Sequence, residues 1–236
     1  MFRMPSPSVL LSTLFALPLV LGSVLAQAEP APPAPAPAPA LRVEVPTFPN
    51  PTCPIMGKKV SMPLFVDTDA GRFYICCKPC IKKIVADLPA ATKTAYPTTK
   101  ELDNKVCPVS GEPIGDDAAT VMLQGYSFRV CCAACVATAR TDSQITLTKL
   151  LRDGIVDVGN TVSPDNGEPV AKNQFVLVGN SLVRLASAKS IESIEKDPAK
   201  MLQKAVEQAK QLPPRPKHVH EKKAETPTAP LPGAGK

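Results

Sequence analysis

The stretch "FYICCKPCIKKI", Phe73–Ile84, places three cysteines within five positions, Cys76, Cys77 and Cys80. A second version, "FRVCCAACVATA", occupies Phe128–Ala139 and holds Cys131, Cys132 and Cys135. In both versions an apolar run typical of a strand leads into the cysteines, and a helical pattern follows them. The sequence therefore predicts a strand–turn–helix unit that the chain makes twice.

Each of these two stretches is preceded by a short related segment. A third segment of the same kind begins a further copy, which has no cysteine. The three segments are "CPIMGKKV" at Cys53, "CPVSGEPI" at Cys107 and "SPDNGEPV" at Ser163, about 55 residues apart. Each is followed by two β-rich runs with a glycine-containing turn between them, which predicts a hairpin. The predicted turns are Asp69–Gly71, Gln124-Gly125 and Gly179-Asn180.

The hairpins and helices together predict an α+β fold of three tandem ββα modules. In the third copy Asp197-Pro198 forms a helix start, and a long amphipathic helix is predicted from about Ala199 to Leu212. A module of about 50 residues has a marginal hydrophobic core, so a metal, disulfides or packing between modules must stabilise it.

The two ends of the chain have a different composition. Arg3, the apolar run Val9–Leu25 and Ala26-Gln27-Ala28 predict a cleaved signal peptide, and an uncleaved anchor is the alternative. We therefore expect an exported protein, periplasmic or extracellular, with no membrane span after signal removal, in a compartment that permits disulfides. The predicted boundaries are a signal peptide at 1–28, a Pro/Ala-rich linker at 29–51, modules at 52–100, 101–156 and 157–212, and a disordered tail at 213–236.

Composition excludes some classes of function. The formal charge is only +6, aromatics are 4% and Trp is absent, so we expect no nucleic-acid binding. The only histidines, His218 and His220, lie in the tail, and the chain has no Ser-His-Asp, P-loop or dinucleotide motif. An enzyme that needs a general base is therefore not expected.

The eight cysteines fall four to a module, and the third module has none. Its equivalent positions are Ser163, Ala186, Ser187 and Ser190. Clustered thiolates suit Zn(II) or Cu(I), and we expect about one ion in each cysteine-containing module, with four thiolates favouring tetrahedral Zn(II) and three favouring trigonal Cu(I). The candidate ligands are Cys53, Cys76, Cys77 and Cys80 in module 1, and Cys107, Cys131, Cys132 and Cys135 in module 2.

Two details of ligation stay open at the level of sequence. Adjacent residues on a strand point to opposite faces, so one member of each Cys-Cys pair is expected to point away unless the chain turns there. Met56 could add a thioether ligand for Cu(I), although such a methionine more often packs against its neighbours.

The motif "CPIMG" or "CPVSG", followed by "FYICCKPC" or "FRVCCAAC" and a helix, resembles the YHS and TRASH families of small cysteine-containing modules. The resemblance covers about 40 residues in each of the first two copies and only the skeleton of the third. It implies a treble-clef or zinc-ribbon type of fold and the binding, sensing or trafficking of heavy metals. The TRASH-like spacing selects Cys53, Cys76 and Cys80 in module 1, and Cys107, Cys131 and Cys135 in module 2.

We therefore expect metal sequestration, delivery or sensing, without catalysis. One alternative is a disulfide-stabilised structural or interaction protein of the cell envelope. Another is a thiol-disulfide oxidoreductase that uses "CKPC" and "CAAC". The third module is expected to be a metal-free packing or interaction module that offers a surface to a protein partner and whose long helix covers its neighbours.

Overall fold

The computed structural model describes residues 41–211. The predicted signal peptide, most of the predicted linker, and the C-terminal tail with His218 and His220 lie outside the described residues. Among the residues that are described, no helix has the length and apolar character that a membrane crossing requires.

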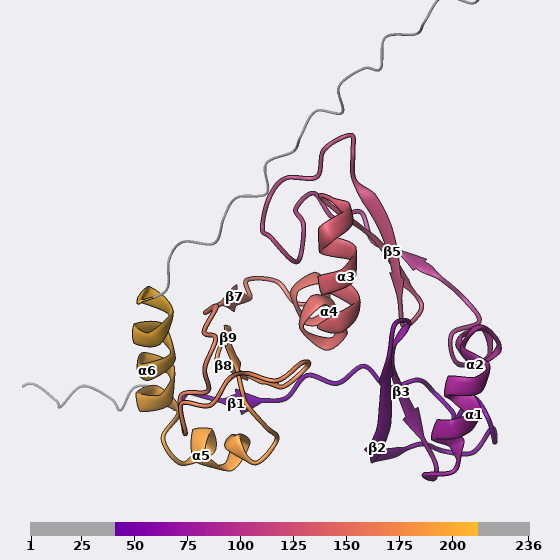
Figure 1. Cartoon of the computed structure of the whole chain (residues 1–236), viewed down its shortest axis with the longest axis horizontal. Helices are drawn as coiled ribbons and strands as arrows, with labels where there is room; N and C mark the ends of the chain where they lie inside the picture. The colour runs from indigo at the N-terminus through magenta and orange to yellow at the C-terminus, as the bar shows by residue number, and fades with distance from the viewer. Residues whose placement is uncertain (1–40, 212–236) are drawn as a thin grey trace, which may run out of the picture. The chain divides into compact units, whose positions relative to one another are not determined.

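Module 1 is a β-hairpin followed by two short helices (Figure 1). The hairpin pairs β2 (Ser61–Thr68) with β3 (Gly71–Ile75), and the helices are α1 (Cys80–Ala86) and α2 (Leu88–Ala95). The sequence predicted only the first helix. Helix α2 begins because the Asp87 side chain caps it, accepting a hydrogen bond from the Ala90 N–H at 3.0 Å, and because Pro89 suits the first turn.

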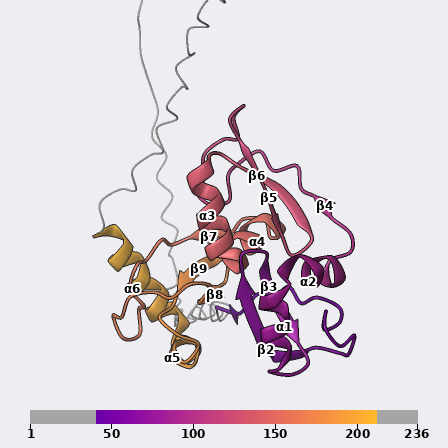
Figure 2. The ribbon, with the colours of Figure 1, turned by 45° about the vertical axis from the view of Figure 1, so that its right-hand side comes forward.

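Module 2 repeats this order and adds a short third strand. Its elements are β4 (Lys100–Glu101), β5 (Ala119–Leu123), β6 (Tyr126–Val130), α3 (Ala133–Thr141) and α4 (Ser143–Leu151). Strand β4 pairs in parallel with β6, and β5 pairs with β6 as the antiparallel hairpin. Helix α3 lies against this hairpin in both Figure 1 and Figure 2.

Module 3 has the same architecture without cysteines. It comprises β7 (Val156–Asp157), β8 (Phe175–Val178), β9 (Ser181–Arg184), α5 (Ser190–Lys196) and α6 (Pro198–Lys210). A further strand, β1 (Val43–Glu44), pairs antiparallel with β8 and completes a four-stranded sheet in the order β1-β8-β9-β7. The predicted linker thus contributes residues 43–44 to the sheet of the third module.

The predicted α+β class is confirmed, and each predicted hairpin turn lies between two strands. The repeating unit is ββαα rather than ββα, because each module has a second helix. In module 2 the turn is the two-residue Gln124-Gly125, with φ of +48° and +78°. Positive φ at both positions matches the right-handed twist of the flanking strands, which explains the glycine.

Modules 2 and 3 share a core across strand β8, whose alternate side chains enter two different clusters. Phe175 and Leu177 pack with Ile145 of α4, whereas Val176 and Val178 pack with the helices of module 3. The long helix α6 therefore covers its own sheet, and α4 covers the other face. This differs from the expectation that α6 covers a neighbouring module.

A buried glutamine connects modules 1 and 2. Gln124 is 4% exposed, and its side chain accepts hydrogen bonds from the Arg72 N–H at 3.1 Å and from Gln144 Nε2. Its amide donates to the Phe48 carbonyl at 2.7 Å, and its backbone N–H donates to the Ala70 carbonyl at 3.1 Å. Because buried amides are costly when they lack partners, this network fixes the two hairpin tips against each other.

Candidate metal centres

The first cysteine of modules 1 and 2, and Ser163 in module 3, each lie in a tight loop that we call the knuckle, residues 52–59, 106–113 and 162–169. In module 1 the Cys53 N–H donates to the Lys58 carbonyl and the Gly57 N–H donates to the Cys53 carbonyl, both at 2.8 Å. The ends of the loop are bridged between Thr52 and Lys59. Gly57 has φ of +63°, which an L side chain rarely adopts, so glycine is needed at the turn.

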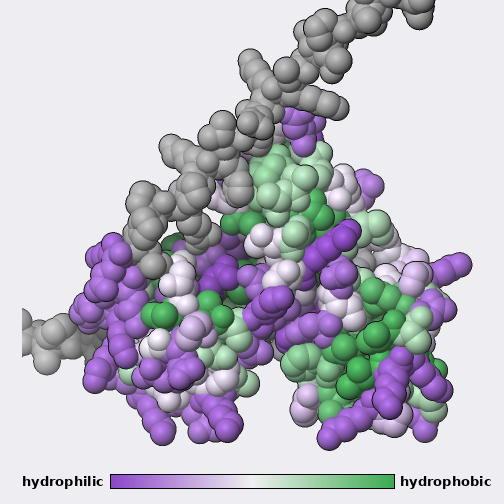
Figure 3. Space-filling model, in the orientation of Figure 1, coloured by the Kyte–Doolittle hydropathy of each residue, from purple (hydrophilic) through white to green (hydrophobic). Residues whose placement is uncertain are grey.

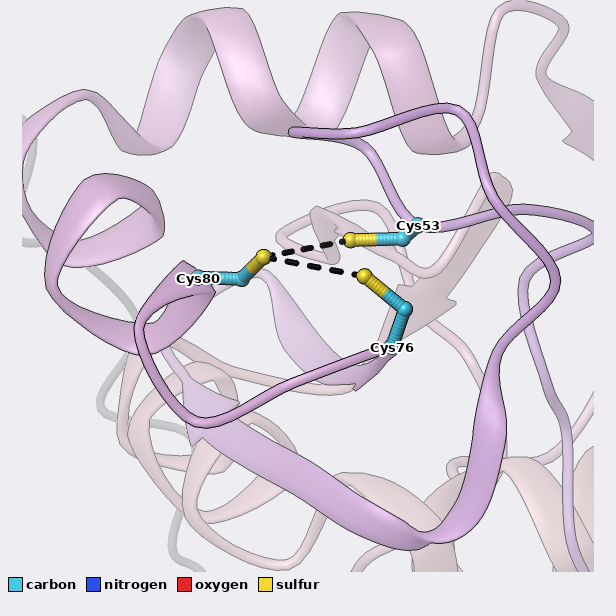
Figure 4. Close-up of side chains that lie close together, drawn as sticks. All are labelled: Cys53, Cys76 and Cys80. Atoms are coloured by element: carbon cyan, nitrogen blue, oxygen red, sulfur yellow. Dashed lines mark hydrogen bonds between the residues drawn. The ribbon is translucent and has the colours of Figure 1, made fainter.

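Cys53, Cys76 and Cys80 reach one point from three elements (Figure 4). Cys53 comes from the knuckle, Cys76 follows the last residue of β3, and Cys80 is the first residue of α1. Their sulfurs lie within 4.8 Å of one another, with Sγ–Sγ distances of 3.6 Å for Cys53–Cys80 and 3.9 Å for Cys76–Cys80. We call these three and Cys77 site 1.

Cys77 belongs to the edge of this group. Its Sγ lies 3.4 Å from that of Cys80 and 3.8 Å from that of Cys76. The strand rule that predicted one cysteine of the pair pointing away does not apply, because β3 ends at Ile75 and the chain turns before Cys76. Both cysteines therefore remain near Cys80, with Cys76 in the compact triad and Cys77 beside it.

Module 2 repeats the arrangement with Cys107, Cys131 and Cys135, whose sulfurs also lie within 4.8 Å of one another. The Sγ atoms of Cys131 and Cys132 each lie 3.5 Å from that of Cys135. We call these four residues site 2. Ser110 is an addition here, since its hydroxyl lies 3.3 Å from the Cys131 sulfur.

The sulfur spacing fits a metal better than it fits covalent sulfur pairs. Zn–S bonds of about 2.3 Å in a tetrahedron place neighbouring sulfurs about 3.8 Å apart. Six Sγ–Sγ distances in the two sites lie between 3.4 and 3.9 Å, and all eight cysteines are free. A disulfide would require about 2.05 Å. Both sites thus offer soft donors at the separations that a single ion requires.

The knuckle cysteine is the most easily ionised thiol of each site. Burial opposes ionisation of Cys53, but backbone N–H groups of Cys76, Ile55 and Met56 lower its pKa to about 7. Burial likewise opposes ionisation of Cys107, and the groups that outweigh it and lower its pKa to about 7 include the backbone N–H of Ser110. Each site therefore has one thiol that is substantially thiolate at neutral pH.

Other thiols of each site hold their protons more strongly. Burial and the adjacent thiols Cys77 and Cys53 raise the pKa of Cys80 to about 12. Burial raises the pKa of Cys131 to about 11 and also raises that of Cys135. Binding of a cation must displace these protons, so metal uptake by either site is coupled to proton release.

An asparagine that the sequence analysis missed holds the knuckle in place. Asn50 is 1% exposed, and its amide donates to the Thr52 carbonyl at 2.7 Å and to the Tyr74 carbonyl at 3.0 Å. Its oxygen accepts from the Tyr74 N–H at 2.7 Å. Asn50 thus pairs with strand β3 two residues before Cys76 and ties that strand to the residue that precedes Cys53.

The same three hydrogen bonds recur in the other two modules. Asn104 bonds to Val106 and Arg129 over 2.8–3.0 Å, and Asn160 bonds to Val162 and Arg184 over 2.8–3.0 Å. We call this feature the asparagine clamp. The sequence signal for it is an asparagine three residues before the first cysteine or serine of each copy, in "NPTCP", "NKVCP" and "NTVSP".

We expect Asn50→Ala to weaken metal binding at site 1 by about 10–100-fold, because outer-shell hydrogen bonds orient the ligands. Site 2 should be unaffected. The matched control is Asn160→Ala, which should lower the free energy of unfolding by about 1–3 kcal/mol without changing metal affinity. Competition against a chromophoric chelator measures both sites, and an unchanged site 1 affinity in Asn50→Ala would show that the clamp is structural alone.

Module 3 has the same backbone scaffold, but hydroxyl and carboxylate oxygens lie where modules 1 and 2 have thiols. The Ser163 N–H donates to the Glu168 carbonyl and the Gly167 N–H donates to the Ser163 carbonyl, both at 2.8 Å, as in the cysteine-containing knuckles. The Ser163 hydroxyl donates to Asp165 Oδ1 at 2.5 Å. Although burial acts to raise it, the hydroxyls of Ser163 and Ser190 lower the pKa of Asp165. A carboxylate therefore stands beside the positions that thiols occupy in sites 1 and 2.

The sequence left open whether Met56 adds a thioether ligand. Met56 is 48% exposed, and it is the Met56 backbone N–H that helps to lower the pKa of Cys53.

In comparisons of the chain with known proteins, no family model, no curated protein and no solved structure matches. The resemblance to YHS and TRASH modules therefore stays a prediction from the motif.

Proposed function

We propose that the protein binds one soft metal ion in each of its first two modules and sequesters, delivers or senses that metal outside the cytoplasm. The observation that carries the proposal is the pair of cysteine triads, each with three sulfurs within 4.8 Å of one another. One such cluster can arise from the packing of small apolar thiols. Two clusters built from the same elements in separate modules favour a shared chemical role.

Site 1 can supply four sulfurs, because Cys77 lies within 3.9 Å of two members of the triad. Four thiolates favour tetrahedral Zn(II), and the triad alone favours trigonal Cu(I). The knuckle cysteine is the first ligand to offer a thiolate, since its pKa is the one lowered to about 7. The other thiols then lose their protons as the ion is bound.

The resemblance to YHS and TRASH modules and the signal-like N-terminal segment extend the proposal to heavy-metal handling in the periplasm or outside the cell. The chain's own residues provide ligands, a buried environment and a positioning clamp. The two clusters of closely spaced thiols favour a binding role, which we propose in preference to an enzyme.

Elemental analysis of the mature protein, purified anaerobically, tests the proposal. We expect about two equivalents of zinc or copper in the wild type. The Cys80→Ser variant should retain one equivalent, whereas Ser190→Ala, its counterpart in module 3, should retain two. Mass analysis of the same sample should give Glu29 as the first residue, and a cytosolic protein with an intact N-terminus would contradict export.

Two outcomes would replace metal binding by another function. A protein without metal and without free thiols would instead be a disulfide-stabilised envelope protein. Thiol-exchange activity on a test substrate, lost on changing Cys77, would indicate an oxidoreductase. Counting free thiols with and without a chelator separates these results from metal binding, because bound metal masks thiols reversibly.

A further inference from the structure

Sites 1 and 2 have the same ligands but opposite surroundings. Five positions around site 1 are lysines: Lys58, Lys59, Lys78, Lys82 and Lys83. The equivalent residues around site 2 are Glu112, Pro113, Ala133, Ala137 and Thr138, and module 3 has Glu168, Pro169, Ala188, Glu192 and Ser193. We call the five lysines the lysine rim. Of the three modules, only module 1 has lysines at these five positions.

All five lysines are exposed, and each is tied closely to the ligand-bearing segments. The Lys58 carbonyl accepts from the Cys53 N–H at 2.8 Å, and the Lys78 carbonyl accepts from the Ile81 N–H at 3.1 Å. Lys82 and Lys83 follow Cys80 within the first turn of α1. These neighbouring positions in the ligand-bearing segments concentrate positive charge on module 1, and salt screens such charges over about 8 Å at physiological ionic strength.

The lysine rim is not compensated within the part of the chain that is described. None of its members forms an ion pair in residues 41–211. Helix α1 has no acidic residue in its first turn, and Asp87 at its end caps α2 instead. Five neighbouring like charges repel one another, which is a cost that folding alone does not require.

Neutralisation of the thiolates does not explain these lysines. Site 2 carries the same four thiols and has no lysine at any of the equivalent positions. Exposed apolar side chains, Met56 at 48% and Val85 at 65%, lie in the same segments as the lysine rim. In Figure 3 hydrophobic surface gathers over module 1, with hydrophilic atoms along its edge. A mixed apolar and cationic surface beside an accessible thiol is typical of a docking site.

We propose that the lysine rim docks an acidic metal-carrying protein that exchanges its ion with site 1. This rests on the proposed function and adds a partner for one of its two sites. An acidic protein is favoured over a membrane surface because the lysines belong to the segments that carry the ligands, where the ion is exchanged. Site 2, without the rim, retains its ion without such a partner.

The exchange proceeds by ligand substitution through Cys77, whose sulfur is half-exposed at the edge of the triad. When metal leaves site 1, a thiol of the partner loses its proton and forms a metal–sulfur bond, and the bond to the Cys77 thiolate breaks. The released Cys77 thiolate takes up the proton. Repetition at the remaining ligands completes the transfer, and no electron is gained or lost.

Transfer kinetics from a synthetic donor test the proposal. The protein starts loaded with natural zinc, so that its modules are folded, and the donor is a peptide loaded with isotopically labelled Zn(II) on one Cys-x-x-Cys loop flanked by Asp and Glu. The control peptide carries Asn and Gln flanks. The full-length Cys135→Ser variant reports site 1, and Cys80→Ser reports site 2. We expect the acidic donor to load site 1 about tenfold faster than the neutral donor at low salt, with no such preference at site 2.

Matched charge variants make the test specific. Lys78→Gln/Lys82→Gln/Lys83→Gln should abolish the preference at site 1 and leave its zinc stoichiometry unchanged. Lys196→Gln/Lys200→Gln/Lys210→Gln, which removes exposed charges from module 3, should leave the preference intact. Equal rates from both donors, or an equal loss in both triple variants, would overturn the docking proposal while metal binding stands.

Two further results separate the remaining possibilities. Binding of the lysine rim to phosphatidylglycerol-rich vesicles, without any preference between donors, would overturn the proposal in favour of a membrane surface. If site 1 takes up no zinc at equilibrium from either donor, the proposed function itself fails. Stoichiometry and rate thus distinguish the two failures.

Discussion

Removal of metal with a chelator is expected to unfold modules 1 and 2 while module 3 keeps its fold. Bound structural zinc contributes about 10–16 kcal/mol of apparent free energy in small zinc-binding domains. In module 1, Cys53 and Cys80 are members of the hydrophobic cluster itself, together with only a few larger side chains such as Phe73, Ile75 and Ile84. A module of this size cannot replace that contribution by apolar burial alone.

Module 3 differs because its stability has other sources. Its sheet has four strands, and β8 is buried on both faces. Oxygen-based contacts between Ser163 and Asp165 replace the thiol cluster. Arg184 donates to Asp142 at 2.9 Å and to Asp157 at 3.2 Å, which adds a half-buried ion-pair network at the boundary with module 2. None of these interactions depends on a metal.

Hydrogen exchange followed by mass spectrometry measures this expectation region by region. After chelation under reducing conditions, amide protection should fall in 71–80 and 126–135 and persist in 175–185. Loss of α4 from its place against Phe175 and Leu177 should lower the stability of module 3 without unfolding it. The appropriate control restores protection by adding zinc back. Uniform loss or uniform retention across the three modules would show that metal is not the stabilising element.

The sequence predicted those features of the fold that follow from local chemistry. Glycine-containing turns located the hairpins, and Asp197 with Pro198 located the start of α6. The second helix of module 1 was missed although Asp87 and Pro89 carry the same kind of signal, because its apolar face consists of small residues such as Ala91 and Ala95. Small side chains give a weak periodic pattern.

Features that depend on distant residues could not be predicted in this way. Strand β1 has two residues, and it forms only because β8, more than a hundred residues later in the chain, offers a free edge. The asparagine clamp likewise acts on a strand far from it in sequence, since Asn50 bonds to Tyr74, 24 residues later. At the candidate sites the sequence identified the cysteines. The end of β3 at Ile75 explains why both Cys76 and Cys77 lie near Cys80, and local sequence did not predict it.

Restoring the cysteines of module 3 is expected to create a third metal site. The knuckle around Ser163 has the same backbone hydrogen bonds as those around Cys53 and Cys107, and Asn160 clamps it in the same way. Helix α5 begins at Ser190, as α1 begins at Cys80. The scaffold that positions three sulfurs is therefore already present, and only the donor atoms differ.

The variant that tests this is Ser163→Cys/Ala186→Cys/Ser190→Cys with Asp165→Val, which installs the residue found at Val109 in module 2. Asp165 must be replaced because its carboxylate accepts the Ser163 hydroxyl and would compete for the space of the ion. We expect zinc content to rise from about two to about three equivalents, since three thiolates on a positioned scaffold suffice for tight binding when water or a fourth donor completes the shell.

Two controls make the gain of binding informative. Ser163→Cys alone should bind no additional ion, because a single thiol cannot hold one. Adding Asn160→Ala to the full variant should weaken the new site by about 10–100-fold, as expected for Asn50→Ala at site 1. A variant that folds, judged by retained protection in 175–185, yet still binds only two ions would show that similar backbone geometry is insufficient. In that case the positions of Cys77 and Cys132, absent from the design, would be required for a complete site.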